Sequence, residues 1–178
     1  MANGLHRYGR EALYTDLLAY QLYNNMLQQP RENSIAGVND EQQEIKWVVV
    51  HADSLNSFRM PRQNGMRRQG FFNSGYLYVT YNADKEKTAL LNTRGGSSVY
   101  VNGEPHTGDP YASGWLYIPV KLKKGLNEFY IRSGFRTIAS LIFPVKPVGL
   151  NTEDPTLPVV VLQNNNASLQ GAVVVINS

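Results

Sequence analysis

The chain has no cysteine, few charges and no long apolar run, and each shortage excludes a class of protein. Without cysteine there is no disulfide framework, no Cys-ligated zinc site and no thiol nucleophile. No apolar run approaches the roughly 20 residues of a membrane-spanning helix, so we predict no membrane span. Three histidines are too few for a histidine-based metal site to be expected, so we assign no metal-ligating residues among them.

The charged residues are also too scattered for a nucleic-acid partner. The net charge is only +3. The densest basic cluster, residues 59–68, contains Pro, Gly and Asn and reads as a loop, without the helix or aromatic platform of a nucleic-acid interface. The sequence therefore predicts no nucleic-acid binding. A hydrophobic content of 42% excludes disorder as the dominant state.

What the chain does contain is a series of short strands separated by turn residues. Residues 99–101 are β-branched and aromatic, and Asn102-Gly103 supplies the left-handed backbone of a tight hairpin turn. Residues 114–122 form another strand, which Pro119 limits to an edge or bulge position. Further strands are predicted at 45–51, 71–81, 88–92, 127–132 and 136–145. Strands at roughly ten-residue spacing with Gly and Asn turns favour a β-sandwich or barrel.

One amphipathic helix is predicted before the strands, over residues 9–29. Leu13, Leu17 and Tyr20 follow helical spacing, and Pro30 ends the pattern. We divide the chain into a helix and loop (1–44), a β-sandwich (45–147), a proline-containing linker (148–158) and the first strands of another domain (159–178). Two strands are not stable alone, so the last segment either completes the first sheet or belongs to a longer protein, which we favour.

Residues 75–129 carry a family resemblance. The strand GYLYVTYNA, the hairpin VYVNGEPHTGD and the edge strand with its turn YIPVKLKKGLNEF resemble the galactose-binding-domain-like jelly-roll modules of secreted multidomain hydrolases, especially glycan-active enzymes of Bacteroidetes. The lead-in segments HRYGREALYTD and WVVVHADSLNSF are similar to those of exported esterase- or peptidase-type proteins of that group. The tail LPVVVLQNNNASLQGAVVVIN resembles the opening of an immunoglobulin-like domain.

The resemblance implies a fold and a role. The expected fold is a mostly β jelly-roll sandwich with an N-terminal amphipathic helix, followed by the start of an Ig-like domain. The expected role is a non-catalytic accessory module that packs on or spaces the catalytic domain of its parent chain and binds carbohydrate weakly. Its expected location is secreted, periplasmic or at the cell surface, with the leader removed. The alternative is a structural or adhesion module that acts through protein–protein contacts.

Four residues are the candidate ligand-binding residues: Arg94, Asp109, Tyr111 and Trp115. A sugar ring needs an aromatic surface and two or three directed polar groups, and these loops offer both. Asp109 could also ligate a structural calcium ion, although no other cofactor is expected. Each residue also has a structural interpretation: Asp109 can close an Asx turn, and strand aromatics commonly pack in cores or across strands.

No catalytic residue is predicted. Ser97 and Ser98 lack the Gly-x-Ser-x-Gly elbow of a serine hydrolase, and Gly95-Gly96 lacks the Lys-Ser/Thr and helix of a phosphate loop. Glycosidic cleavage needs two facing carboxylates, but most acids lie in predicted loops. Glu128 lies on a predicted strand, where its position next to a turn predicts a solvated side chain.

Overall fold

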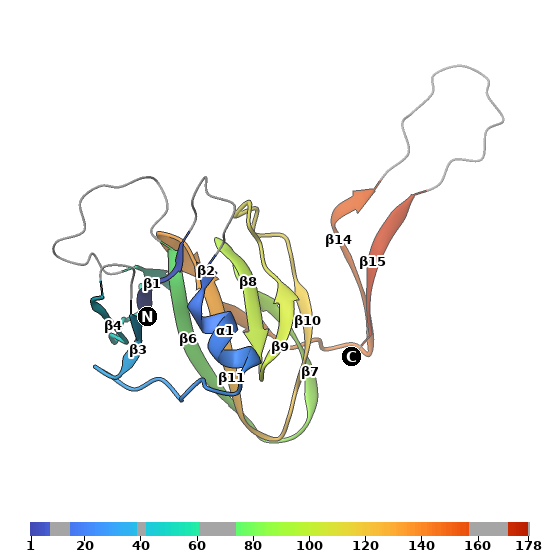
Figure 1. Ribbon diagram of the computed structural model, residues 1–178. Helices are drawn as coiled ribbons and strands as arrows, with labels where there is room; N and C mark the ends of the chain where they lie inside the picture. The colour runs from blue at the N-terminus through green and yellow to red at the C-terminus, as the bar shows by residue number, and fades with distance from the viewer. Residues whose placement is uncertain (8–14, 39–41, 61–73, 157–170, 178) are drawn as a thin grey trace, which may run out of the picture.

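The computed structural model describes residues 1–7, 15–38, 42–60, 74–156 and 171–177 of the chain. This part is mostly β-structure with one short helix, which confirms the mostly β character of the predicted fold (Figure 1). The largest sheet has the strand order β2-β1-β6-β11-β8-β9, with antiparallel neighbours throughout. Its strands are β1 (Ala2–Arg7), β2 (Thr15–Asp16), β6 (Ser74–Ala83), β8 (Gly96–Val101), β9 (Glu104–Thr107) and β11 (Gly125–Ser133).

A three-stranded antiparallel sheet with the order β10-β7-β13 packs against one face of the six-stranded sheet. Its strands are β7 (Lys87–Asn92), β10 (Ile118–Leu122) and β13 (Ser140–Ile142). Three strand pairs complete the described structure: β3 (Ile35–Val38) with β4 (Glu44–Lys46), β5 (Ser57–Arg59) with β12 (Arg136–Ile138), and β14 (Val148–Thr156) with β15 (Ala172–Asn177).

The main core lies between the two larger sheets, because alternate strand residues point to the same face. From the six-stranded sheet, Leu77, Phe129 and Ile131 contribute buried side chains. From the three-stranded sheet, Leu91 and Val120 meet them in the same cluster. The two layers therefore form the sandwich-like arrangement that the strand pattern predicts.

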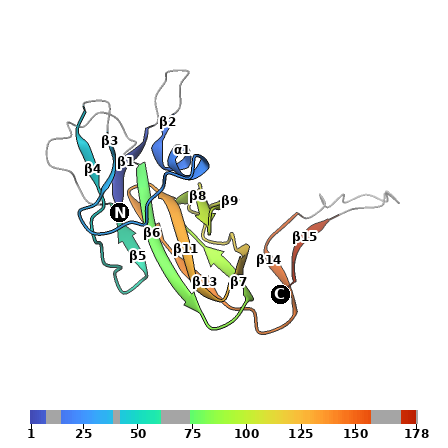
Figure 2. The same cartoon turned by 60° about the horizontal axis from the view of Figure 1, so that its bottom comes forward.

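The other face of the six-stranded sheet, which we call the outer face, is also partly covered. Helix α1 (Leu17–Tyr23) packs on it, as Figures 1 and 2 show, and the β3–β4 hairpin contributes Ala36 and Ile45 to the same buried cluster. This second cluster forms around Leu18, Ile45, Trp47, Tyr76 and Tyr130. The outer face is thus an aromatic surface under a helix and a hairpin.

One predicted turn and one predicted edge strand are confirmed. Asn102 and Gly103 have φ values of 51° and 92° and connect β8 to β9 as a tight hairpin. Pro119 lies in β10, and β10 is the edge strand of its sheet, so the missing N–H of the proline breaks no central ladder. The turn before Gly125 carries the chain from β10 in one sheet to β11 in the other.

The predicted helix over 9–29 is too long. The described helix α1 begins after Asp16, whose carboxylate caps it by accepting a hydrogen bond from Ala19 N at 3.0 Å. It ends at Tyr23, and Asn25 then adopts a positive φ of 55°, which an α-helix cannot continue. Pro30 therefore does not end the helix, and residues 9–14 lie outside the described part of the chain.

The predicted loop over 31–44 and the predicted strand over 45–51 are wrong in part. Strand β3 lies within the former, and only residues 45 and 46 of the latter belong to a strand, β4. Strand β4 ends early because the backbone changes its hydrogen-bond partner after Trp47. Trp47 N donates to Ser34 O at 3.0 Å, and Val48 N donates to Met1 O at 2.9 Å, so the ladder is interrupted between them. A similar change divides residues 136–145 into β12, which pairs with β5, and β13, which pairs with β7.

The predicted linker at 148–158 contains a strand. Residues 148–156 form β14, which pairs with β15 in a ribbon that extends away from the sheets (Figure 1). Pro155 is tolerated because the register shifts between Asn151 and Thr156. The predicted strand at 159–162 lies outside the described residues. Within the described segments, no helix has the length and apolarity needed to cross a membrane.

Candidate functional site

The four residues predicted to bind ligand lie on two neighbouring loops. Arg94 and Asp109 form an isolated parallel β-bridge, which brings their loops together. The chain then turns through Tyr111 to Trp115, so three of the four residues follow one another in residues 109–115, which we call the Asp109 loop. The structure therefore brings Arg94 to the loop that holds the other three.

Asp109 is used inside its own loop. Its side chain is buried, with 1% of the residue exposed. One carboxylate oxygen accepts hydrogen bonds from Ser113 N at 3.0 Å and Ser113 Oγ at 2.9 Å, and the other accepts from Gly114 N at 2.6 Å. Burial opposes ionisation of this carboxyl, but the Gly114 and Ser113 donors outweigh it and hold its pKa below the usual range. Asp109 therefore closes a turn, the structural interpretation that its sequence context allows.

The other three residues of this group have different environments. Arg94 Nε donates to Ala112 O at 2.9 Å, and its side chain lies over Gly114, where an added Cβ would be 3.2 Å from Arg94 Cδ. Tyr111 is 91% exposed. Trp115 is half-buried, and its carbonyl accepts from Asn151 Nδ2 at 3.3 Å. Arg94 thus supports the turn, and Tyr111 stands in solvent.

A second candidate site lies on the outer face, beside a row of aromatic side chains. Tyr130 on β11 is directly opposite Tyr78 on β6 and Tyr100 on β8. The Tyr78 and Tyr130 ring centroids are 4.9 Å apart. Trp47 contacts both rings edge-on, at 6.3 Å and 6.4 Å. The register of three antiparallel strands therefore gathers aromatic residues that are far apart in the sequence.

Next to this row is a hollow of about 450 Å³, which we call the Tyr130 recess. It lies between the end of α1 with the segment that follows it and the turn between β8 and β9. Its lining residues are Leu22, Leu27, Gln29, Asn102, Gly103, Leu126, Glu128 and Tyr130. The lining thus combines three leucine side chains with amide, carboxylate and hydroxyl groups.

Two consecutive hydrogen bonds link Gln29 and Glu128 of the recess through the hydroxyl group of Tyr78. Gln29 Nε2 donates to the Tyr78 hydroxyl at 3.3 Å, and this hydroxyl donates to Glu128 Oε1 at 2.7 Å. Burial raises the pKa of Tyr78 to about 12, and Glu128 acts in the same direction, so the hydroxyl keeps its proton at neutral pH. Burial also raises the pKa of Tyr130, followed by the charge of Glu128. Both tyrosines therefore remain hydrogen-bond donors.

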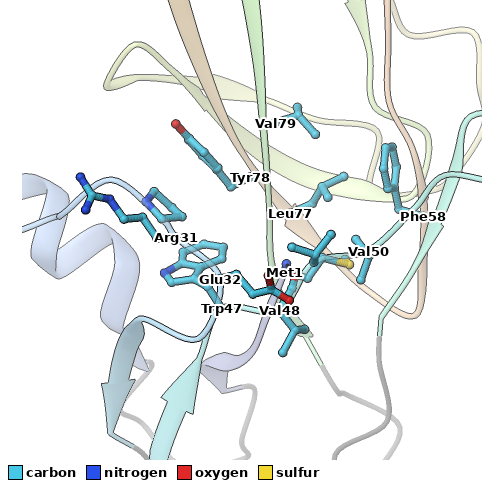
Figure 3. Close-up of a pocket in the computed structure, with 12 residues that line it drawn as sticks. Met1, Arg31, Glu32, Trp47, Val48, Val50, Phe58, Leu77, Tyr78 and Val79 are labelled. Carbon is cyan, nitrogen blue, oxygen red and sulfur yellow. Dashed lines mark hydrogen bonds between the residues drawn. The ribbon is translucent and has the colours of Figure 1, made fainter.

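A second, smaller hollow of about 190 Å³ lies at the edge of β6, and we call it the Trp47 recess (Figure 3). The described pairing between β1 and β6 ends at Tyr76, and beyond it β6 pairs with β11 alone. Trp47 and Tyr78 lie at one end of the hollow, Val50 and Phe58 at the other. Most of the residues that line this recess are apolar, but the charged residues Arg31 and Glu32 also line it, beside Trp47.

The sequence analysis missed the residues of the Tyr130 recess. Glu128 is predicted to be solvated, but it is half-buried and bonded to Tyr78. A signal was present: Tyr76 and Tyr78, and likewise Glu128 and Tyr130, alternate with apolar residues and so share one face of a strand. The pairing of β6 with β11, which joins the two sets, is not visible in that alternation.

In the described part of the chain, no three His, Asp or Glu side chains gather as a set that could hold a metal ion. Comparison of the chain with protein-family models, curated proteins and solved structures finds no match.

Proposed function

We propose that this chain is a jelly-roll accessory module without catalytic activity of its own. It belongs to a secreted multidomain hydrolase of the Bacteroidetes type, packs on or spaces the catalytic domain, and binds carbohydrate. The observation that carries the binding role is the Tyr130 recess, where apolar walls and directed polar groups converge. The resemblance of residues 75–129 to galactose-binding-like modules supports the same role.

The chemistry of the recess suits a sugar. Leu22, Leu27 and Leu126 can cover the apolar C–H face of a pyranose ring, while Glu128 accepts hydrogen bonds from hydroxyl groups and Tyr130 donates one. Only the edge of Tyr130 is available, because the residue is 5% exposed. Stacking on a tyrosine face is therefore replaced by packing on leucine. The Asp109 loop is less suited, because both Asp109 oxygens are occupied.

Affinity electrophoresis of the full chain in gels that contain soluble polysaccharides tests this function. We expect at least one polysaccharide to retard the chain. Leu126→Arg should abolish the retardation, because it places a long charged side chain at the mouth of the recess, where Leu126 is 45% exposed. Leu55→Arg is the matched control, since Leu55 is 67% exposed and outside the recess. Retardation by no polysaccharide, or equal loss in both variants, would contradict the proposal.

A second candidate function rests on the β14–β15 ribbon. A two-stranded ribbon is marginally stable in water, and this one exposes Val148, Leu150, Val174 and Val175, each at least half exposed. These side chains support a structural or adhesion module that acts through protein–protein contacts. Light scattering after size-exclusion chromatography tests this function. We expect the wild type to have a mass above that of one chain, and Val174→Lys to have the mass of one chain. The same mass for the wild type and Val174→Lys would contradict it.

A further inference from the structure

The Tyr130 recess contains a carboxylate that has no positive partner among the described residues. Glu128 is half-buried, and its Oε1 atom accepts the hydrogen bond from the Tyr78 hydroxyl at 2.7 Å. The ion pairs of the described chain involve other acids: Glu44, Asp84, Asp16 and Asp53. Within the described residues, Glu128 therefore has a hydrogen-bond partner in Tyr78 but no ion-pair partner.

Among the described residues that line the recess, Glu128 is also the only charged one. The other polar groups of the recess are mostly hydrogen-bond acceptors, or they already take part in hydrogen bonds within the protein. Asn102 donates to Asn127 Oδ1 at 2.9 Å and accepts from Glu128 N at 3.0 Å, so its amide faces inward on the turn. Gln29 uses an N–H group on the Tyr78 hydroxyl, and its carbonyl oxygen is an acceptor. The recess thus presents acceptor oxygens, one negative charge and the Tyr130 hydroxyl.

A half-buried carboxylate that has given up part of its hydration binds best to a ligand that supplies a cation. A ligand ammonium has only donors, and it matches the acceptors of Glu128 and Gln29. An acidic or sulfated sugar would instead place like charges together in a partly desolvated hollow, which is unfavourable. The leucine walls require that the cation be carried on a body with apolar faces.

We propose that the Tyr130 recess recognises an amino sugar, a pyranose unit whose amino group is free and protonated. The ammonium lies at Glu128, the C–H face of the ring packs on Leu22 and Leu27, and a ring hydroxyl accepts from Tyr130. This inference rests on the proposed carbohydrate-binding function and adds the class of sugar. A lysine side chain of a partner protein would share the ammonium chemistry and is an outcome of the test below.

Isothermal titration calorimetry on the full chain tests the inference with three tetrasaccharides: a glucosamine tetramer, its fully N-acetylated form and a glucuronic-acid-containing tetramer. The pH is held where the free amine is protonated. Because a charge-assisted hydrogen bond is worth more than a neutral one, we expect the glucosamine tetramer to bind at least tenfold more tightly than the N-acetylated form, and the acidic tetramer not to bind.

Glu128→Gln should remove that preference while leaving the thermal midpoint of unfolding within a few degrees, because the glutamine carbonyl still accepts from Tyr78. Glu104→Gln is the control, an exposed acid on the same sheet that should keep the preference. Equal affinity for the amino and N-acetylated tetramers, or a preference that survives in Glu128→Gln, would overturn the amino-sugar inference and leave carbohydrate binding standing.

Two other outcomes distinguish failure of the proposed carbohydrate binding from failure of the amino-sugar inference. If no tetrasaccharide binds and no polysaccharide retards the chain, both the inference and the proposed function fail. If a lysine-containing tetrapeptide binds as tightly as the glucosamine tetramer and loses its affinity in Glu128→Gln, the recess recognises an ammonium group irrespective of the sugar, and the inference of an amino sugar is wrong.

Discussion

Single buried polar side chains hold the turns of this protein. Asn127 is fully buried, and its Oδ1 accepts from Lys123 N at 2.9 Å while its Nδ2 donates to Lys123 O at 2.8 Å and Gly125 O at 2.9 Å. Asn102 also donates to Asn127 Oδ1, which ties the hairpin turn to the turn between the sheets. These backbone groups would otherwise lie unpaired, and an unpaired buried polar group costs about 1–3 kcal/mol.

Asn127→Ala should therefore lower the free energy of unfolding by about 3 kcal/mol, since it leaves several backbone groups of the turn without a partner. Urea-induced unfolding followed by tryptophan fluorescence measures the change. Lys124→Ala, in the same turn but exposed, should have little effect. Similar values for the two variants would show that the Asn127 network does not stabilise the turn.

Asp109 makes stability depend on pH. Its folded-state pKa lies below the value of about 3.9 that it has when unfolded, so its contribution is complete above pH 4 and is lost as the pH falls through the folded-state pKa. In Asp109→Asn the amide cannot accept from both Ser113 and Gly114, and we expect a loss of about 2 kcal/mol at pH 7.

That difference between Asp109→Asn and the wild type should shrink as the pH falls below 4. Urea unfolding at a series of pH values measures it. Glu86→Gln, an exposed acid, is the control and should track the wild type at every pH. A difference between Asp109→Asn and the wild type that stays constant down to pH 2 would mean that the carboxylate is not the group responsible.

At the scale of elements, strands with local signals could be predicted, and elements that depend on distant partners could not. The Asn102-Gly103 hairpin, the edge position of Pro119 and strand β7 all follow from nearby residues. Strand β3 was missed because its short, mixed segment is stabilised by pairing with β4. Helix α1 was predicted too long because apolar spacing continues past Asn25, where the backbone leaves the helical region.

Helix α1 is held in place by a residue at its N-terminus, Asp16. Asp16 caps the helix through Ala19 N, accepts from the buried Tyr76 hydroxyl at 2.6 Å, and lies 3.9 Å from Arg132 Nη1. One carboxylate thus fastens the helix to strands β6 and β11. Removing it loses a cap and leaves a buried hydroxyl without its acceptor.

We expect Asp16→Ala to lower the free energy of unfolding by about 2–3 kcal/mol, measured by urea unfolding. The matched control is Asp84→Ala, which removes an exposed acid whose ion pair with Lys87 lies on the surface, and which should leave the unfolding midpoint unchanged. If Asp16→Ala causes no further loss of stability in a protein that already carries Tyr76→Phe, the contact with the Tyr76 hydroxyl accounts for the effect. An effect no larger than that of Asp84→Ala would contradict this account of the helix.

At the scale of the whole molecule, the six-stranded sheet is covered on both faces, and this creates the candidate site. One face packs on β7, β10 and β13, and the other lies under α1 and the β3–β4 hairpin. The sequence indicated a ligand site at Asp109 because loops with Asp and aromatic residues often bind sugars. It could not indicate the Tyr130 recess, because Gln29, Asn102 and Glu128 meet only when β11 pairs between β6 and β8.

The most direct test of the central claim is a map of the ligand-binding surface. Amide chemical shifts of the ¹⁵N-labelled full chain are recorded during titration with the glucosamine tetramer and with oligosaccharides of the polysaccharide that retards the chain most. We predict that the largest shifts fall on Leu27, Gly103 and Glu128. Shifts that are confined to Tyr111 and Trp115, with the recess unchanged, would place the binding site in the Asp109 loop and contradict the account.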